Sequence, residues 1–361
     1  MSSARPLRVG FIGGGFMGDV HSRASRAARA TLAGVCSSSR ASSERVATTL
    51  GFEKAFDSAA DLLADDAIDL VHVVTPNATH LEFALAAIAA GKHVVCEKPL
   101  ATSTSDAAQL AAAATAAGVT ATVPFVYRFH PMVREARARV RAGETGQLLS
   151  IQGSYLQDWL LASSDDNWRV DAKLGGPSRA FADIGSHLCD LTEFVTGDRI
   201  SRVQALTRIV FDQRATNRGI TTEDLVAVLV ETRSGAIGTL LVSQVAPGRK
   251  NRLHLEISGS AETIGFDQED PETLWLGRRT GSQLLRRNND ELSADAVRVS
   301  TLPPGHPLGY QDAFNAFVAD SYAAVAGEAR EGLPTFDDGL RAVRLTDAVL
   351  ESARSGNWIE M

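Results

Sequence analysis

A glycine-rich turn near the start of the chain constrains the fold more than any other feature. The segment GFIGGGFMG follows an apolar run and places Gly13, Gly15 and Gly18 in a G-x-G-x-x-G spacing. Between a strand and a helix, these glycines allow a tight turn, close approach of the backbone to a pyrophosphate, and close helix–strand packing. Phe16 and Met17 lead into a helix whose first N–H groups face the phosphates. The turn therefore predicts a dinucleotide-binding unit.

Short strands and alanine-rich helices alternate from residue 7 to about residue 126. Strands are expected at 7–13, 31–36, 52–56, 68–75, 93–97 and 120–127, and helices at 17–29, 42–51, 78–90 and 106–117. Asn77 is expected to cap the helix that follows it. This alternation is typical of a parallel sheet covered by helices, which is an α/β fold of the Rossmann kind.

The pattern changes after residue 127. A helix at 131–143 precedes longer alternating runs at 148–157, 201–211, 225–245 and 253–267, with the turn sequences TRSG and ISGS inside the last two. Neighbouring strands joined by short turns predict a large, mostly antiparallel open sheet. We therefore expect a Rossmann domain at 1–126 and an α+β domain for substrate binding and oligomerisation at 127–361. Amphipathic helices at 311–327 and 336–355 close the chain and are candidates to pack back on the first domain.

Composition excludes several classes of function. The 361 residues are too many for one ordinary core. The net charge of -7 argues against a nucleic-acid partner, because phosphate binding needs a basic face. No apolar run of about 18 residues predicts a membrane span. Three scattered cysteines, Cys36, Cys96 and Cys189, have no metal-site spacing and are typical of a reducing compartment, so we expect a cytoplasmic protein without a metal.

The segment after the second expected strand bears on the choice between NAD and NADP. NAD sites usually place an acid there for the ribose hydroxyls, but the sequence reads VCSSSRASSER, with no acid before Glu44. Ser37, Ser38 and Arg40, with Arg45 as a further candidate, are suited to a 2'-phosphate. We favour NADP over NAD; the alternative is a solvated turn that admits either cofactor.

Two loops follow later strands at the edge where open α/β sheets bind ligands. One holds Thr75 and Asn77 and is followed by His80; the other is Glu97-Lys98-Pro99. Lys98 is one of five lysines against thirty-one arginines, and an ammonium takes part in proton transfer where a guanidinium does not. All these side chains are candidates for the cofactor site. The alternatives are a solvated lysine and a capping or packing role for His80.

A second candidate constellation lies in GGPSRAFADIGSHLCDL. Asp183, His187 and Asp190 stand four and three residues apart and are expected to share one helix face. An imidazole beside a carboxylate has a pKa range suited to accepting a hydroxyl proton. Such pairs are also common as purely structural features.

Together these motifs resemble the Gfo/Idh/MocA family of glucose-fructose oxidoreductases and inositol dehydrogenases. The resemblance covers nearly the whole chain: the G-x-G-x-x-G turn, the TPNxxH loop, the EKP tripeptide, the GGxxxxxxDxGxHxxD segment and the ending from PTFDDGL onward. It implies hydride transfer between nicotinamide C4 and a secondary alcohol carbon of a sugar or cyclitol. It also implies a homo-oligomer, a dimer or tetramer, because the open sheet of this family often forms the interface.

The resemblance further implies roles for individual residues. Lys98 would hydrogen-bond the reacting oxygen, His187 would act as general acid/base, and Asp183 would bind a neighbouring hydroxyl or orient the histidine. The other candidates for the substrate pocket, each of which core packing explains equally well, are Tyr127, Arg128, Trp159, Trp168 and Arg169.

Two other functions stay open at this point. Some relatives in the family are glycosidases that oxidise a sugar hydroxyl transiently with tightly held NAD, so net hydride transfer is zero. A redox-sensing module that holds NADP without chemistry is the third hypothesis, and the joint presence of Lys98, Asp183 and His187 argues against it.

Overall fold

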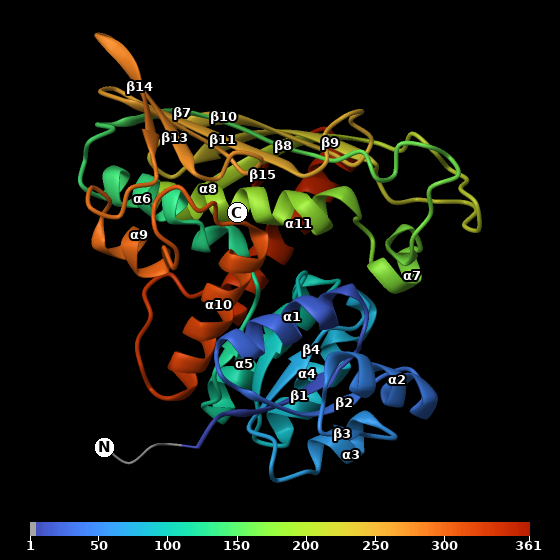
Figure 1. The fold of residues 1–361 in the computed structure, drawn as a ribbon. Helices are drawn as coiled ribbons and strands as arrows, with labels where there is room; N and C mark the ends of the chain where they lie inside the picture. The colour runs from blue at the N-terminus through green and yellow to red at the C-terminus, as the bar shows by residue number, and fades with distance from the viewer. Residues whose placement is uncertain (1–4) are drawn as a thin grey trace. The chain divides into compact units, whose positions relative to one another are not determined.

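The computed structural model describes residues 5–361, which form two compact units (Figure 1). The first unit holds the residues up to Val126 together with Gln311–Arg341. The second holds Tyr127–Tyr310 and Ala342–Met361. Each unit is built around its own sheet.

The sheet of the first unit is fully parallel, and its strand order is β3-β2-β1-β4-β5-β6. This is the order of a Rossmann fold, in which ligands bind where the order reverses between β1 and β4. The core strands β1, β4 and β5 are almost continuously apolar because helices cover both of their faces. The strands are β1 (Arg8–Ile12), β2 (Thr31–Cys36), β3 (Lys54–Ala55), β4 (Leu70–Val73), β5 (His93–Cys96) and β6 (Ala121–Thr122).

The helices of the first unit begin and end largely where the sequence signals stand. Ser39, Ser58 and Ser103 cap α2, α3 and α5, and Gly51 and Gly118 end α2 and α5 in the left-handed conformation. The helices are α1 (Phe16–Ala27), α2 (Arg40–Leu50), α3 (Ala59–Leu63), η1 (Asn77–Thr79), α4 (His80–Ala89), α5 (Thr104–Ala117) and α10 (Tyr310–Val325), with the first part of α11 (Phe336–Ser355).

Two local expectations are wrong. Asn77 does not cap α4; it begins the short 3₁₀ helix η1, and Thr79 precedes α4 without a side-chain cap. The strand expected at 120–127 is reduced to the two residues of β6. Pro124 has no N–H for a ladder, and the chain turns into a second 3₁₀ helix, η2 (Val126–Phe129).

The second unit holds a mixed sheet in the order β14-β13-β12-β11-β7-β10-β9-β8-β15. Every neighbouring pair is antiparallel except β7 and β10, so the predicted fold class is confirmed. The strands are β7 (Leu148–Leu156), β8 (Ile200–Arg208), β9 (Leu225–Thr232), β10 (Ile237–Ser243), β11 (Arg252–Gly259), β12 (Thr263–Asp267), β13 (Thr273–Arg278), β14 (Gly281–Arg286) and β15 (Ile359–Glu360).

Helices cover one face of this sheet (Figure 1). Leu188 and Leu191 of α8 share a core with inward residues such as Ile151, Leu240 and Leu255, while alternate residues of the same strands face outward. The helices are α6 (Pro131–Arg141), η3 (Trp168–Val170), α7 (Ala172–Gly175), η4 (Phe181–Gly185), α8 (Ser186–Thr196), α9 (Ala294–Val299) and the rest of α11. None of the helices in residues 5–361 combines the length and apolar character needed to span a bilayer.

Candidate functional site

The glycine turn between β1 and α1 has the geometry of a phosphate loop. Gly13 has φ +106, and a Cβ built there would lie 2.6 Å from the Val74 carbonyl oxygen, so only glycine fits. A Cβ built at Gly15 meets no other described atom within 4 Å. Gly15 starts α1 without a side-chain cap, and the exposed Phe16 follows it. The backbone at the start of α1 is therefore open to an anion, as a dinucleotide requires.

The segment after β2 carries Ser37, Ser38 and Arg40 at the start of α2. The Ser37 N–H donates to Ser43 Oγ at 2.9 Å, and Ser38 is exposed. The Arg40 guanidinium is half-exposed and pairs with Glu44 at 2.7 Å and Asp57 at 3.1 Å. A cation stands where a nucleotide phosphate is expected, and it is already held by two carboxylates.

Glu97 anchors the loop that carries Lys98. Its Oε2 accepts the N–H of Lys98 at 3.0 Å, and its Oε1 lies 2.9 Å from His21 Nε2 on α1. Burial alone would raise the pKa of Glu97, but the hydrogen bond from His21 and the charges of His21, Lys98 and His80 outweigh it and lower that pKa. Glu97 is thus an ionised carboxylate that accepts the backbone N–H of Lys98. The peptide bond between Lys98 and Pro99 is cis.

His80 joins the two loops on which the cofactor prediction rests. It is fully buried, with Nδ1 2.8 Å from the Pro99 carbonyl and Nε2 3.0 Å from the Thr75 carbonyl. Thr75 Oγ1 also accepts the hydroxyl of Thr79 at 2.8 Å. The Thr75–Asn77 loop and the Glu97–Pro99 loop are therefore brought together through His80.

In the second unit, Asp183 lies in η4, a π-helical turn, and His187 lies in the first turn of α8. Such turns are frequent at functional sites. Asp183 Oδ2 accepts Gln244 Nε2 at 2.8 Å, and its Oδ1 lies 3.5 Å from Arg169 Nε. Asp190, three residues after His187, forms a buried bidentate pair with Arg128. Asp183 and Asp190 thus have separate partners around His187.

A closed ring of hydrogen bonds lies beside His187. Tyr127 donates to the hydroxyl of Tyr155, Tyr155 donates to Asn251 Oδ1 at 2.8 Å, and Asn251 Nδ2 donates back to Tyr127 at 3.2 Å. The rings of Tyr127 and His187 meet edge to face at 5.0 Å. Burial raises the pKa of both tyrosines, so their hydroxyls stay protonated. The ring of Tyr127 holds the His187 imidazole in place by packing against it.

Of the other candidates, Trp168 and Arg169 lie in η3, and the Arg169 guanidinium stacks 4.4 Å from the Trp168 ring. Sequence reasoning missed Gln157, Gln244 and Asn251 as polar partners in this region. Gln157 and Gln244 come directly after β7 and β10, which are parallel and end level, Leu156 beside Ser243. Their common position at one edge of the sheet is the signal that could have found them.

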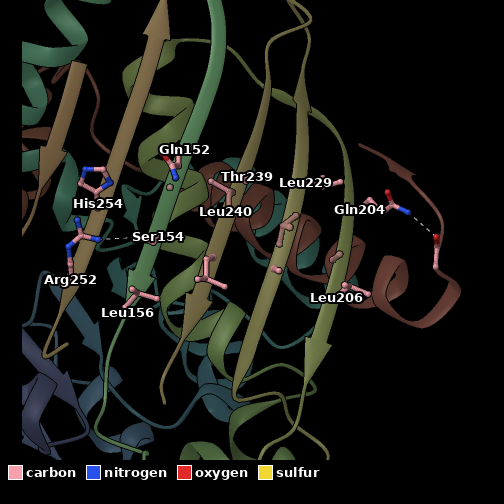
Figure 2. A pocket seen from close by; sticks show the side chains of 16 residues that line it. Gln152, Ser154, Leu156, Gln204, Leu206, Leu229, Thr239, Leu240, Arg252 and His254 are labelled. Carbon is pink, nitrogen blue, oxygen red and sulfur yellow. Dashed lines mark hydrogen bonds between the residues drawn. The ribbon is translucent and has the colours of Figure 1, made fainter. Parts of the chain in front are cut away.

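The outward face of the second sheet carries a pocket of about 870 Å³ (Figure 2). One row across it reads Leu206, Ala227, Leu241, Ser154 and His254, from β8 to β11. The next row begins with Gln204 and Leu229. We call this surface the sheet face.

Comparison with known proteins agrees with both sheets. Residues 7–125 match the family model described as "Oxidoreductase family, NAD-binding Rossmann fold", and residues 133–265 match the "GFO/IDH/MocA C-terminal domain". Levoglucosan dehydrogenase of Pseudarthrobacter phenanthrenivorans is 28% identical, with 98% of each chain covered.

Solved structures extend the comparison to three dimensions. An oxidoreductase domain protein from Kribbella flavida is 35% identical with TM-score 0.91, and 99% of each chain is covered. Levoglucosan dehydrogenase in complex with NADH and levoglucosan superimposes with TM-score 0.92 at 28% identity, again over 99% of each chain. On these matches and on its two sheets, the chain belongs to the Gfo/Idh/MocA family of oxidoreductases.

Proposed function

We propose that this protein transfers a hydride between nicotinamide C4 and a secondary hydroxyl or keto carbon of a sugar, a sugar derivative or a cyclitol. The observation that carries the proposal is the Glu97–Lys98–Pro99 loop, which leaves the carboxyl end of β5 in a sheet with the Rossmann strand order. The similarity to levoglucosan dehydrogenase supports a carbohydrate substrate.

The proposed roles follow the chemistry of each side chain. The nicotinamide, when bound, accepts or supplies two electrons with the hydride. Lys98 Nζ donates a hydrogen bond to the reacting oxygen, and a ring nitrogen of His187 takes the hydroxyl proton in oxidation and returns it in reduction. Asp183, held by Gln244 and Arg169, binds a neighbouring hydroxyl. Trp168 offers an aromatic face to sugar C–H groups.

We extend the proposal to the cofactor and the setting of the reaction. NADP is favoured over NAD because serines and Arg40, and no acid, follow β2. A cytoplasmic setting agrees with Cys36, Cys96 and Cys189, which are buried and unbridged. Assembly into a dimer or tetramer through the sheet face is proposed from the apolar side chains exposed there.

Replacing Lys98 tests the chemistry directly. We expect Lys98→Ala to lower kcat for the best substrate by about 10²- to 10⁴-fold, since a positioned proton-transfer or charge-stabilising group is lost. The measurement is NAD(P)H formation over a panel of sugars and cyclitols with both cofactors. Lys54→Ala, which removes a lysine 58% exposed at the edge strand β3, is the matched control and should leave kcat unchanged.

Near-normal turnover in Lys98→Ala would refute the assignment of Lys98. The glycosidase alternative predicts a different product, because it hydrolyses an aryl glycoside with no net NAD(P)H. Net oxidation is favoured because the similar enzyme is named a dehydrogenase. Cleavage of an aryl glycoside without accumulation of NAD(P)H would reverse that preference.

A further inference from the structure

Five buried side chains of the first unit form one continuous chain of hydrogen bonds. Glu97 Oε1 lies 2.9 Å from His21 Nε2, and His21 Nδ1 lies 2.8 Å from His72 Nδ1. His72 Nε2 lies 2.8 Å from the Tyr322 hydroxyl, which lies 2.7 Å from Ser25 Oγ. Their exposed fractions run from 0% to 9%. Such an array in a low-dielectric core holds only when its donors and acceptors match.

The serine at the far end sets the direction of donation. Ser25 Oγ lies 2.9 Å from the His21 carbonyl oxygen, which only accepts, so the single hydroxyl proton of Ser25 is used there. Tyr322 must then donate to Ser25, and His72 Nε2 must donate to Tyr322. In the opposite direction Ser25 would turn its proton toward Tyr322 and lose its bond to the carbonyl.

The histidines extend this order to Glu97. Burial lowers the pKa of His72 well below its usual value, so its ring is neutral and carries one proton. With that proton on Nε2, the Nδ1 of His72 accepts, and Nδ1 of His21 must donate. Glu97 is ionised, so Nε2 of His21 donates as well. His21 then carries a proton on both nitrogens.

We propose that Glu97, His21, His72, Tyr322 and Ser25 form a directional relay that keeps His21 as an imidazolium paired with Glu97, and that this relay positions the Lys98 loop. The effect on Lys98 rests on the proposed function; the protonation of the relay does not.

The relay acts on Lys98 through both oxygens of Glu97. One oxygen is fixed by His21 and the other accepts the Lys98 N–H, so the carboxylate cannot rotate without losing a buried bond. The positive charge on His21 also balances the carboxylate. The Lys98 ammonium therefore interacts with a His21–Glu97 pair whose charges nearly cancel. If His21 became neutral, the ammonium would interact with the full negative charge of Glu97.

The surroundings contain few other groups that could supply this balance. The ring of His21 packs against Phe11 of β1, His72 of β4 and Phe314 of α10. The charged or titratable groups that act on Glu97 besides His21 are Lys98 and His80, and the Cys96 thiol adjoins it.

Histidine NMR on the full-length protein tests the direction. With ¹⁵N-labelled histidine, we expect His21 protonated at both nitrogens and His72 protonated at Nε2, with signals assigned by their loss in His21→Asn and His72→Asn. Tyr322→Phe leaves His72 Nε2 without a partner, so the relay should reverse and His21 should lose its Nδ1 proton. Ser25→Ala should do the same, because Tyr322 then has only His72 to donate to.

Ser321→Ala is the matched control for both variants. Ser321 neighbours Tyr322 on α10, is fully buried and bonds Thr122 at 3.0 Å, outside the relay. The His21 signals of the Ser321→Ala variant should match those of the unaltered protein. A neutral His21 in the unaltered protein would overturn the proposal, as would unchanged His21 signals in both Tyr322→Phe and Ser25→Ala; either variant suffices if the other fails to fold.

The effect on Lys98 is read from the pH profile of kcat/KM. Reversal leaves Glu97 unbalanced beside the ammonium, so the alkaline limb should move up by about one pH unit in Tyr322→Phe and Ser25→Ala, and stay in place in Ser321→Ala. If the NMR signals reverse in these variants but the pH profile of kcat/KM does not move, the proposal that the relay positions Lys98 is wrong. If the unaltered protein oxidises no sugar or cyclitol, the proposed function fails, and the NMR result still decides the relay.

Discussion

Arg40 stands at the point where a nucleotide phosphate would compete for its charge. Its guanidinium bonds Glu44 on the next turn of α2 and Asp57 after β3. A bound 2'-phosphate would offer a doubly charged partner in place of these two exposed carboxylates, and exposed pairs are weak. Under the proposed preference for NADP, this exchange would favour NADP and would have no counterpart for NAD.

Removal of Arg40 should separate the two cofactors. We expect Arg40→Ala to weaken NADP binding roughly tenfold, because a charge-assisted hydrogen bond to phosphate is lost, and to leave NAD binding unchanged. Titration of cofactor fluorescence measures both dissociation constants. Arg23→Ala, which breaks a similar exposed pair with Asp19 on α1, is the control. Equal weakening of NAD and NADP would show that Arg40 does not read the 2'-phosphate.

Motifs identify residues well when a spacing is tied to one task. Gly13 is such a case, since the turn admits no Cβ. His80 lay within a motif, yet its contacts with two carbonyls follow from the meeting of two loops, which no local pattern shows. His72 and Tyr322 are 250 positions apart, and the sequence contains nothing that links them.

The sheet face has an apolar part and a polar part. Its row from Leu206 through Ala227 to Leu241 is apolar, whereas Ser154 and His254 continue the same row with polar side chains. Leu206 on β8 is 74% exposed and Leu241 on β10 is 43% exposed, and β9 lies between these two strands. Exposed apolar patches rimmed by polar residues mark interaction surfaces.

A charge in the apolar row should prevent assembly. We expect Leu241→Lys to shift the protein from an oligomer to a monomer, because several unpaired lysines would be buried at a shared interface. Light scattering coupled to size exclusion measures the mass. Leu302→Lys, at an exposed leucine outside the sheet, serves as the control. An unaltered mass in Leu241→Lys would mean that copies do not associate through this face.

Elements were predicted best where one period dominated the sequence. The helix–strand alternation up to residue 126 predicted the parallel sheet, and the alternating runs predicted the antiparallel one. Periodicity predicts a helix at 311–327 but does not indicate which of the two sheets this helix accompanies. In the structure, α10 belongs to the first unit. The strand at 120–127 was predicted too long, because pairing with β5 stops at Thr122 and Pro124 has no N–H to donate to a ladder.

Acid should lower the free energy of unfolding of both units, because each contains buried neutral histidines. Burial lowers the pKa of His72 and His80 in the first unit and of His130, to about 4, in the second. The unfolded chain binds these protons near pH 6.5, whereas the folded chain binds them only at lower pH, which for His130 is near pH 4. Stability is therefore complete above about pH 6.5 and is lost as the pH falls toward 4.

His130 allows this to be measured. From its pKa, it should cost the folded state about 2 kcal/mol between pH 7 and pH 5. We expect His130→Leu to reduce the difference in free energy of urea unfolding between these pH values by about that amount, whatever its effect at pH 7. The exposed His306→Leu is the control. An unchanged pH difference in His130→Leu would show that His130 is not held neutral by burial.

Residues 311–341 complete the first unit, although residues 127–310 precede them in the chain. On the ribosome, β4 emerges with His72 about 250 residues before Tyr322. At ordinary rates of translation this is a delay of roughly 10 to 50 seconds. During that interval the nascent nucleotide-binding sheet lacks α10, and the buried His72 ring lacks the Tyr322 hydroxyl that it bonds in the folded protein. The core of the first unit can therefore close only after residues 127–310 have been made.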